Sequence, residues 1–79
     1  MRLKLYGRTY CHLCTDMQEA LQALAVELGF SVEYRDVDAE PLLEERYGDL
    51  VPVLEDERGE EICHYFLDED ALRRRLAVK

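Results

Sequence analysis

Long apolar runs are missing from this sequence of 79 residues. No apolar stretch approaches the ~20 residues that a transmembrane helix needs, so we expect a soluble protein with no membrane partner. Met1 leads directly into the alternating segment 2–6, and we therefore expect no cleavable leader and a cytoplasmic location. The composition, 48% hydrophobic and 35% charged, is typical of a folded chain, and the length of 79 residues predicts one domain over residues 1–79.

Basic residues are scarce as well. The chain has 10 Lys and Arg against 18 Asp and Glu, for a formal net charge of −8. Nucleic-acid binding depends on clustered Lys and Arg that neutralise phosphates. The basic run 73–75 falls near the end of a predicted helix, where cations complement the helix dipole. We therefore expect no nucleic-acid partner.

Cysteine is the third scarce residue, with three copies. An odd number without a secretion signal does not suit a disulfide framework and indicates a redox or metal role. Two cysteines form Cys11-His12-Leu13-Cys14, between an apolar strand-like run and an amphipathic segment. Cys11 would lie at a helix N-terminus, where free N–H groups and the helix dipole favour a thiolate, and Cys14 would follow one turn later. This arrangement predicts thiol–disulfide exchange, with Cys11 attacking a disulfide and Cys14 resolving the mixed disulfide.

The first half of the chain alternates strand and helix patterns. Leu3 and Leu5 predict a strand that ends at Gly7. An apolar stripe then predicts a helix that Gly29 ends, and the alternation over 30–35 predicts a second strand parallel to the first. The stripe consists of Leu13, Met17, Leu21, Leu24 and Leu28.

The second half begins with a short predicted helix. We expect Asp38 to open it, Pro41 to lie in its first turn and Gly48 to stop it. A third strand is predicted from residue 51, and a fourth from Glu60 to Tyr65 or Phe66, after a tight turn.

Asp68 is expected to cap a last helix in which Leu72 and Leu76 face the core. The predicted order, β-α-β-α-β-β-α, is that of the α/β thioredoxin fold. We therefore expect a four-stranded mixed sheet with three helices on both faces.

Three features make the chain resemble a short glutaredoxin-like member of the thioredoxin superfamily over essentially all 79 residues. They are the Cys11–Cys14 segment after the first strand, Val51-Pro52 at the third strand and Asp68-Glu69-Asp70 at the last helix. The resemblance implies that Cys11 and Cys14 are catalytic. It also implies that Pro52 is cis and lies against them, and that the backbone of Val51 pairs with a bound peptide or glutathione. Asp68 joins the substrate-binding residues by the same resemblance.

The resemblance also concerns glutathione. Arg8 stands where glutaredoxins often carry a Lys that meets a glutathione carboxylate. The segment 64–67, His-Tyr-Phe-Leu, replaces a Gly-Gly pair close to which glutathione lies, and its bulkier side chains predict a narrower site. His12 and Leu13 replace the usual Pro-Tyr.

Other side chains near the Cys pair are candidates for the site. Arg8 and His12 can place a cation beside the Cys11 sulfur, although a solvated loop role for His12 stays equally open. Tyr10 is a candidate to floor a substrate groove, with packing against the sheet as the favoured alternative. Cys63 is predicted to be a small half-buried hydrophobe, with Ile62 and His64 on the opposite strand face.

We interpret the chain as a monomeric thiol–disulfide oxidoreductase. Its expected partners are a disulfide-containing protein or a glutathione adduct, with glutathione or a thioredoxin-reductase-type protein as reductant. No bound cofactor is expected, and glutathione is a candidate co-substrate. Two alternatives stay open. One is a metal protein. It would have either a zinc site of Cys11, Cys14, Cys63 and His64, although Cys63 and His64 should face apart, or an iron–sulfur cluster held by two thiolates from two chains. The other is a non-catalytic adaptor.

Overall fold

The computed structural model describes residues 1–77 and has the predicted order of elements. These elements are β1 (Arg2–Gly7), α1 (His12–Leu28), β2 (Ser31–Asp36), the 3₁₀ turn η1 (Val37–Ala39), α2 (Pro41–Tyr47), β3 (Val53–Glu55), β4 (Glu61–His64) and α3 (Glu69–Ala77). Within residues 1–77, no helix combines the length and apolar character that crossing a bilayer requires.

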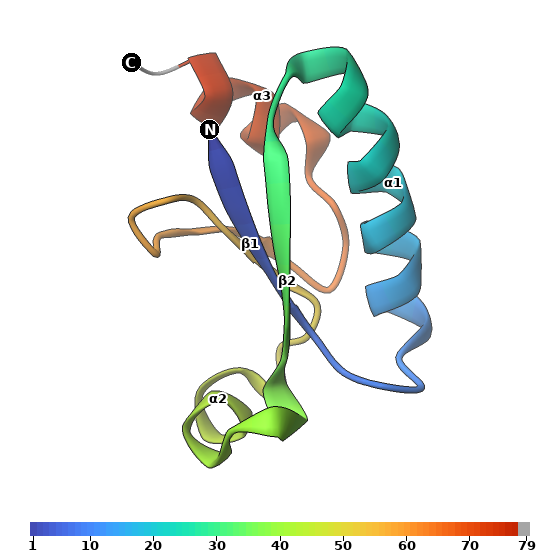
Figure 1. Cartoon of the computed structure of the whole chain (residues 1–79), viewed down its shortest axis with the longest axis vertical. Coiled ribbons are helices and arrows are strands. Elements are labelled where there is room, and N and C mark those ends of the chain that lie inside the picture. Colours follow the sequence, from blue (N-terminus) through green and yellow to red (C-terminus); the bar gives the residue numbers. More distant parts are fainter. Residues whose placement is uncertain (78–79) are drawn as a thin grey trace.

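The strands form one four-stranded mixed sheet in the order β2-β1-β3-β4. Strand β1 pairs in parallel with β2, so that Leu3 lies opposite Val32, and antiparallel with β3, so that Leu5 lies opposite Leu54. The prediction of a mixed sheet is confirmed. Figure 1 shows the N-terminus and α3 at one end of the sheet, and α2 together with the β1–α1 connection at the other.

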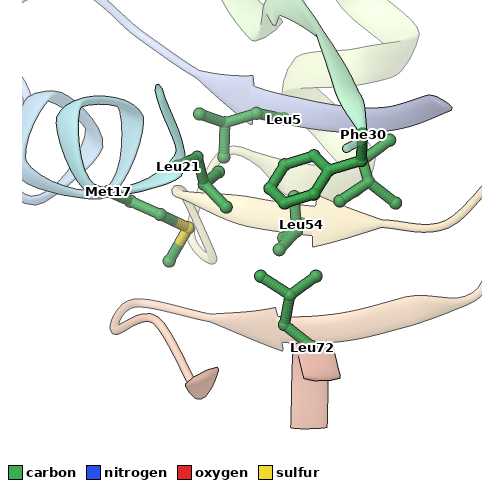
Figure 2. Packing of buried hydrophobic residues seen from close by; sticks show 7 residues of the cluster. Leu5, Met17, Leu21, Phe30, Leu54 and Leu72 are labelled. Carbon is green, nitrogen blue, oxygen red and sulfur yellow. The ribbon is translucent and has the colours of Figure 1, made fainter. Parts of the chain in front are cut away.

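One face of the sheet carries the larger core. Side chains of β1 and β3 alternate, and their inward members meet apolar side chains of α1 and α3 (Figure 2). The buried residues are Leu3, Leu5, Met17, Leu21, Phe30, Leu54 and Leu72. Since Leu21 is 1% exposed, truncating it to Ala would cost ~2–5 kcal/mol of folding free energy. The predicted apolar stripe of α1 is therefore its core-facing side.

The other face of the sheet packs against α2 and contains polar groups. Tyr6 of β1 stacks on Tyr47 of α2 with ring centroids 4.2 Å apart, next to Val53. The Tyr47 hydroxyl donates a hydrogen bond of 2.6 Å to the buried carboxylate of Glu55. The pKa of Tyr47 is raised, first by burial and then by this bond. Because α2 lies opposite α1 and α3, the predicted helices on both faces are confirmed.

The helix ends follow the predicted caps. Gly29 ends α1 in the left-handed conformation, with φ of 76°, and its N–H donates to the carbonyl of Ala25 at 2.9 Å. At α3, the carboxylate of Asp68 accepts from the N–H of Ala71 at 3.0 Å. Asp68 is thus confirmed as an N-cap.

The second helix begins later than predicted. Asp38 lies inside η1, whose cap is Asp36, and α2 begins at Pro41. A proline disfavours helical backbone in the residue before it, and Glu40 is extended, with φ of −138° and ψ of 129°. The extended Glu40 separates η1 from α2, so the prediction that Asp38 opens the second helix was wrong.

Strand β4 is irregular and shorter than predicted. Leu54 pairs with Cys63 and Glu55 pairs with Glu61, so the register skips Ile62 as a β-bulge. Ile62 and Cys63 consequently both pack against the larger core, and the prediction that they face apart was wrong. The strand ends at His64 because Tyr65 has a φ of 63°, outside the β region.

Candidate active site

Cys11 is the N-cap residue of α1. Its backbone is extended, and its Sγ accepts a hydrogen bond of 3.1 Å from the backbone N–H of Cys14. The first turn of α1, residues 12–15, carries no acidic side chain. A sulfur held at these backbone N–H groups, at the positive end of a long helix, has an environment that stabilises a negative charge.

The two cysteines of the pair differ in exposure. They are joined by a disulfide, with their Cα atoms 5.2 Å apart. Cys11 is partly exposed, whereas Cys14 is 2% exposed and points into the domain. A partner sulfur can therefore form a mixed disulfide with Cys11 from the solvent side. Cys14 would then reach the Cys11 sulfur from the buried side.

The Val51–Pro52 peptide bond is cis, as the resemblance implied. Pro52 is buried and Val51 is half-buried, packed against the cluster around Tyr6. The contact of Pro52 with the Cys pair and the pairing of Val51 with a substrate backbone stay predictions.

Arg8 binds the second half of the chain. Its guanidinium donates to the carboxylate of Asp38, at 2.6 Å and 3.3 Å, and to the backbone oxygen of Gly48 at 3.1 Å. The hydrogen bond with Asp38 raises the pKa of Arg8 and lowers that of Asp38. Arg8 therefore joins the segment before Cys11 to η1 and to the end of α2. Its contact with a substrate carboxylate stays a prediction.

Tyr10 and His12 flank Cys11 and point to solvent. Tyr10 has a φ of 60° and is 103% exposed, so the favoured alternative of packing against the sheet was wrong. Tyr6 is the tyrosine that packs there. His12 begins α1 and is exposed. Both side chains are accessible to a partner, and their role in substrate binding stays a prediction.

Tyr65 makes two hydrogen bonds that the sequence did not predict. Its N–H donates to the carbonyl of Pro52 at 2.9 Å, and its hydroxyl donates to the carbonyl of Asp49 at 3.0 Å. The loop between β4 and α3 is thereby attached to the segment around the cis peptide bond. From the sequence, Tyr65 is only one of the bulky residues of the segment 64–67. Its hydrogen bonds could not be predicted, because both acceptors are backbone oxygens and no sequence motif marks a backbone oxygen.

Asp68 and Cys63 have structural contacts. The Asp68 carboxylate caps α3, and its role in substrate binding stays a prediction. Cys63 is half-buried against the larger core, as predicted, and burial raises the pKa of its thiol. Among residues 1–77, no three His, Cys, Asp or Glu side chains are gathered in a way that would hold a metal ion.

Comparison with known proteins agrees with this geometry. A family model described as a glutaredoxin-like domain matches residues 2–77. A comparison with curated proteins found no match.

Solved structures of similar proteins cover almost the whole chain. The solution structure of Ne2328 from Nitrosomonas europaea is 39% identical, with a TM-score of 0.85 over 96% of this chain and 91% of that one. A protein from X. campestris is 38% identical, with a TM-score of 0.70 over 94% and 93%. Thioredoxin 1 from Thermosipho africanus shares the fold at 19% identity, with a TM-score of 0.66 over 96% and 94%. The chain therefore has a thioredoxin fold and belongs to the glutaredoxin-like family.

Proposed function

We propose that this protein is a thiol–disulfide oxidoreductase in which Cys11 is the attacking residue and Cys14 the resolving residue. The observation that carries the proposal is the asymmetry of the pair. Cys11 is a partly exposed N-cap that accepts a backbone N–H, and Cys14 is buried one turn further along the same helix. Glutaredoxin-like family membership supports the same chemistry.

The reaction begins with the reduced pair. The Cys11 thiolate attacks one sulfur of a substrate disulfide, that S–S bond breaks, and the other substrate sulfur leaves as a thiolate. Cys14 then loses its proton and attacks the Cys11 sulfur, which releases the second substrate thiol and forms the Cys11–Cys14 disulfide. Two electrons pass from the pair to the substrate. A thiol reductant, either glutathione or a thioredoxin-reductase-type protein, restores the dithiol.

We propose substrates of two kinds, disulfides within proteins and glutathione mixed disulfides. Arg8 and the exposed Tyr10 and His12 lie on either side of Cys11 in sequence, where a bound partner would meet them. We place the reaction in the cytoplasm, where the reductants above are present, and expect the protein to act as a monomer.

Trapping with Cys14→Ser tests this proposal. The variant retains the attacking sulfur and lacks the resolving one, so it should accumulate a mixed disulfide between Cys11 and an added disulfide substrate, visible by mass spectrometry. Cys63→Ser is the matched control, because it removes a thiol and leaves the pair intact. It should trap nothing.

Mass spectrometry can also follow the oxidation of the unaltered, reduced protein in graded mixtures of reduced and oxidised glutathione. The expected product is the Cys11–Cys14 disulfide, and a glutathione adduct on Cys11 would identify glutathione as co-substrate. Failure to form that disulfide would contradict the proposal that the protein is a thiol–disulfide oxidoreductase. An adaptor would be unaffected by Cys14→Ser, and a metal protein would lose its ion.

A further inference from the structure

A groove lies between α1 and the loop that precedes α3. One wall is formed by Leu13, Asp16, Met17 and Ala20 on a single face of α1, and the other by residues 65–67. Figure 1 shows this loop in orange, in the fainter, more distant part of the view. The groove has a volume of about 190 Å³. Small-molecule sites commonly occupy ~300–1,000 Å³, so this groove has room for a single side chain.

The groove extends to the first turn of α1, where the proposed active site lies. Leu13, one of its lining residues, stands between the two cysteines of the pair in the sequence. On the opposite wall, Tyr65 donates its backbone N–H to Pro52, next to the cis peptide bond. A polypeptide whose cysteine reacts with Cys11 would therefore bring its neighbouring residues to this groove.

The lining of the groove is apolar and aromatic, with one carboxylate. Met17 is buried at its floor, while Tyr65 and Phe66 are 40% and 69% exposed. Among the lining residues, all within the described part of the chain, Asp16 alone carries a charge, and it is exposed.

This lining suits a long basic side chain. The aliphatic stem of Arg or Lys can lie along Leu13 and Met17, and its cationic head can reach Asp16 and an aromatic face. The net charge of −8 also attracts basic polypeptides at long range, so it favours the same kind of substrate as the groove. Glutathione carries two carboxylates and one amine, and Asp16 would repel it.

We propose that the groove binds an Arg or Lys side chain of a protein substrate, located beside the cysteine that is exchanged. This inference rests on the proposed exchange activity and specifies its substrate class. The protein would then prefer disulfides in basic polypeptide segments to acidic glutathione adducts.

Matched peptides test the proposal. Each peptide carries one cysteine, blocked by 2-mercaptoethanol as a mixed disulfide, and differs only in the neighbouring residue, which is Arg, Gln or Glu. The reduced protein should release 2-mercaptoethanol from the Arg peptide about threefold faster than from the Gln peptide, the size expected for one exposed charge pair with an aromatic contact. The Glu peptide should be slowest.

Two variants locate the effect. Asp16→Asn removes the carboxylate of the groove and should abolish the preference for Arg over Gln. Glu19→Gln changes the net charge equally, at an exposed position on α1 that does not line the groove, and should retain the preference. A preference that survives in Asp16→Asn, or one that Glu19→Gln abolishes equally, would overturn the groove as its source.

A small neutral substrate separates this proposal from the one on which it rests. Hydroxyethyl disulfide has no charge and no side chain for the groove. If the unaltered protein does not reduce it, exchange activity itself is refuted. If the protein reduces it and reacts equally with the Arg and Gln peptides, exchange stands and the groove proposal is wrong.

Discussion

The chain places the same side chain in two opposite environments, at the Cys11–Cys14 pair and at Cys63. Cys11 lies at the end of a helix, partly exposed, with a backbone N–H on its sulfur. Cys63 lies in the middle of a strand, half-buried against the larger core opposite Leu54. We expect the position of each cysteine, at the end of an element or in its interior, to separate a reactive thiol from one that only packs.

The electrostatic surroundings of the two cysteines also differ, and the difference concerns how readily each sulfur would carry a negative charge. Around Cys63, burial raises the thiol pKa more than a backbone hydrogen bond from Asp68 lowers it, and the carboxylates of Asp68 and Glu61 add to the rise. At Cys11, the backbone N–H of Cys14 donates to the sulfur, and residues 12–15 carry no carboxylate. We therefore expect burial to disfavour a negative charge on the Cys63 sulfur, and the helix N-terminus to favour one on the Cys11 sulfur once the disulfide is reduced.

The largest difference should appear in activity. Cys11→Ser replaces the attacking sulfur with a hydroxyl that stays protonated at neutral pH, and should reduce turnover of hydroxyethyl disulfide to below about 1% of the unaltered rate. Cys63→Ser should retain most of the rate. Comparable losses of turnover in both variants would mean that Cys63 takes part in the exchange reaction and that the two cysteines do not differ as proposed.

Alkylation sharpens the contrast in a second way. A raised pKa means that the Cys63 thiol ionises only above its usual range, so its thiolate fraction at pH 7 is smaller than that of an ordinary thiol. With limiting iodoacetamide and the reduced protein at pH 7, mass spectrometry of peptides should find Cys11 modified first and Cys63 last. In denaturant, where burial is lost, Cys63 should react much faster. Equal rates in the folded protein would contradict the assignment.

Cys63 should matter more for stability than for chemistry. Cys63→Ala removes a sulfur packed against the larger core and should lower the free energy of unfolding by about 1 kcal/mol, measured by denaturant titration. Cys63→Val, which keeps an apolar side chain of similar size, should recover most of this loss. If both variants lost exchange activity while their stability was unchanged, Cys63 would be a residue of the reaction and not a packing residue.

The smallest effect is expected from the ion pair between Arg8 and Asp38. Because the pKa of Asp38 is lowered, its ionised form stabilises the folded state above pH ~4, and this contribution disappears as the pH falls through the lowered value. Arg8→Gln should therefore reduce the denaturant midpoint at pH 7, by less than Cys63→Ala does, and have little effect at pH 2. A difference that persists at pH 2 would mean that the hydrogen bond from Arg8 to Gly48 dominates.

Most of the fold could be predicted because its signals are local. The spacing of Leu13, Met17 and Leu21, together with Gly29, was sufficient to place α1, since periodicity and capping depend on neighbouring residues. The predictions failed where two local signals competed. At Asp38 the capping preference lost to the constraint of Pro41, and at Ile62 the alternation of a strand lost to a bulge.

The sequence by itself determined the order of the elements, the ends of α1 and the position of Cys11 at a helix N-terminus, because each depends on residues within about one helical turn. Only the tertiary structure decided that Arg8 meets Asp38, that Tyr65 is bonded to Pro52, and that a groove opens beside Leu13. These contacts join residues 13 or more positions apart in the sequence. Their acceptors are largely backbone oxygens and exposed carboxylates, whose positions follow from how the sheet and helices pack rather than from any residue pattern.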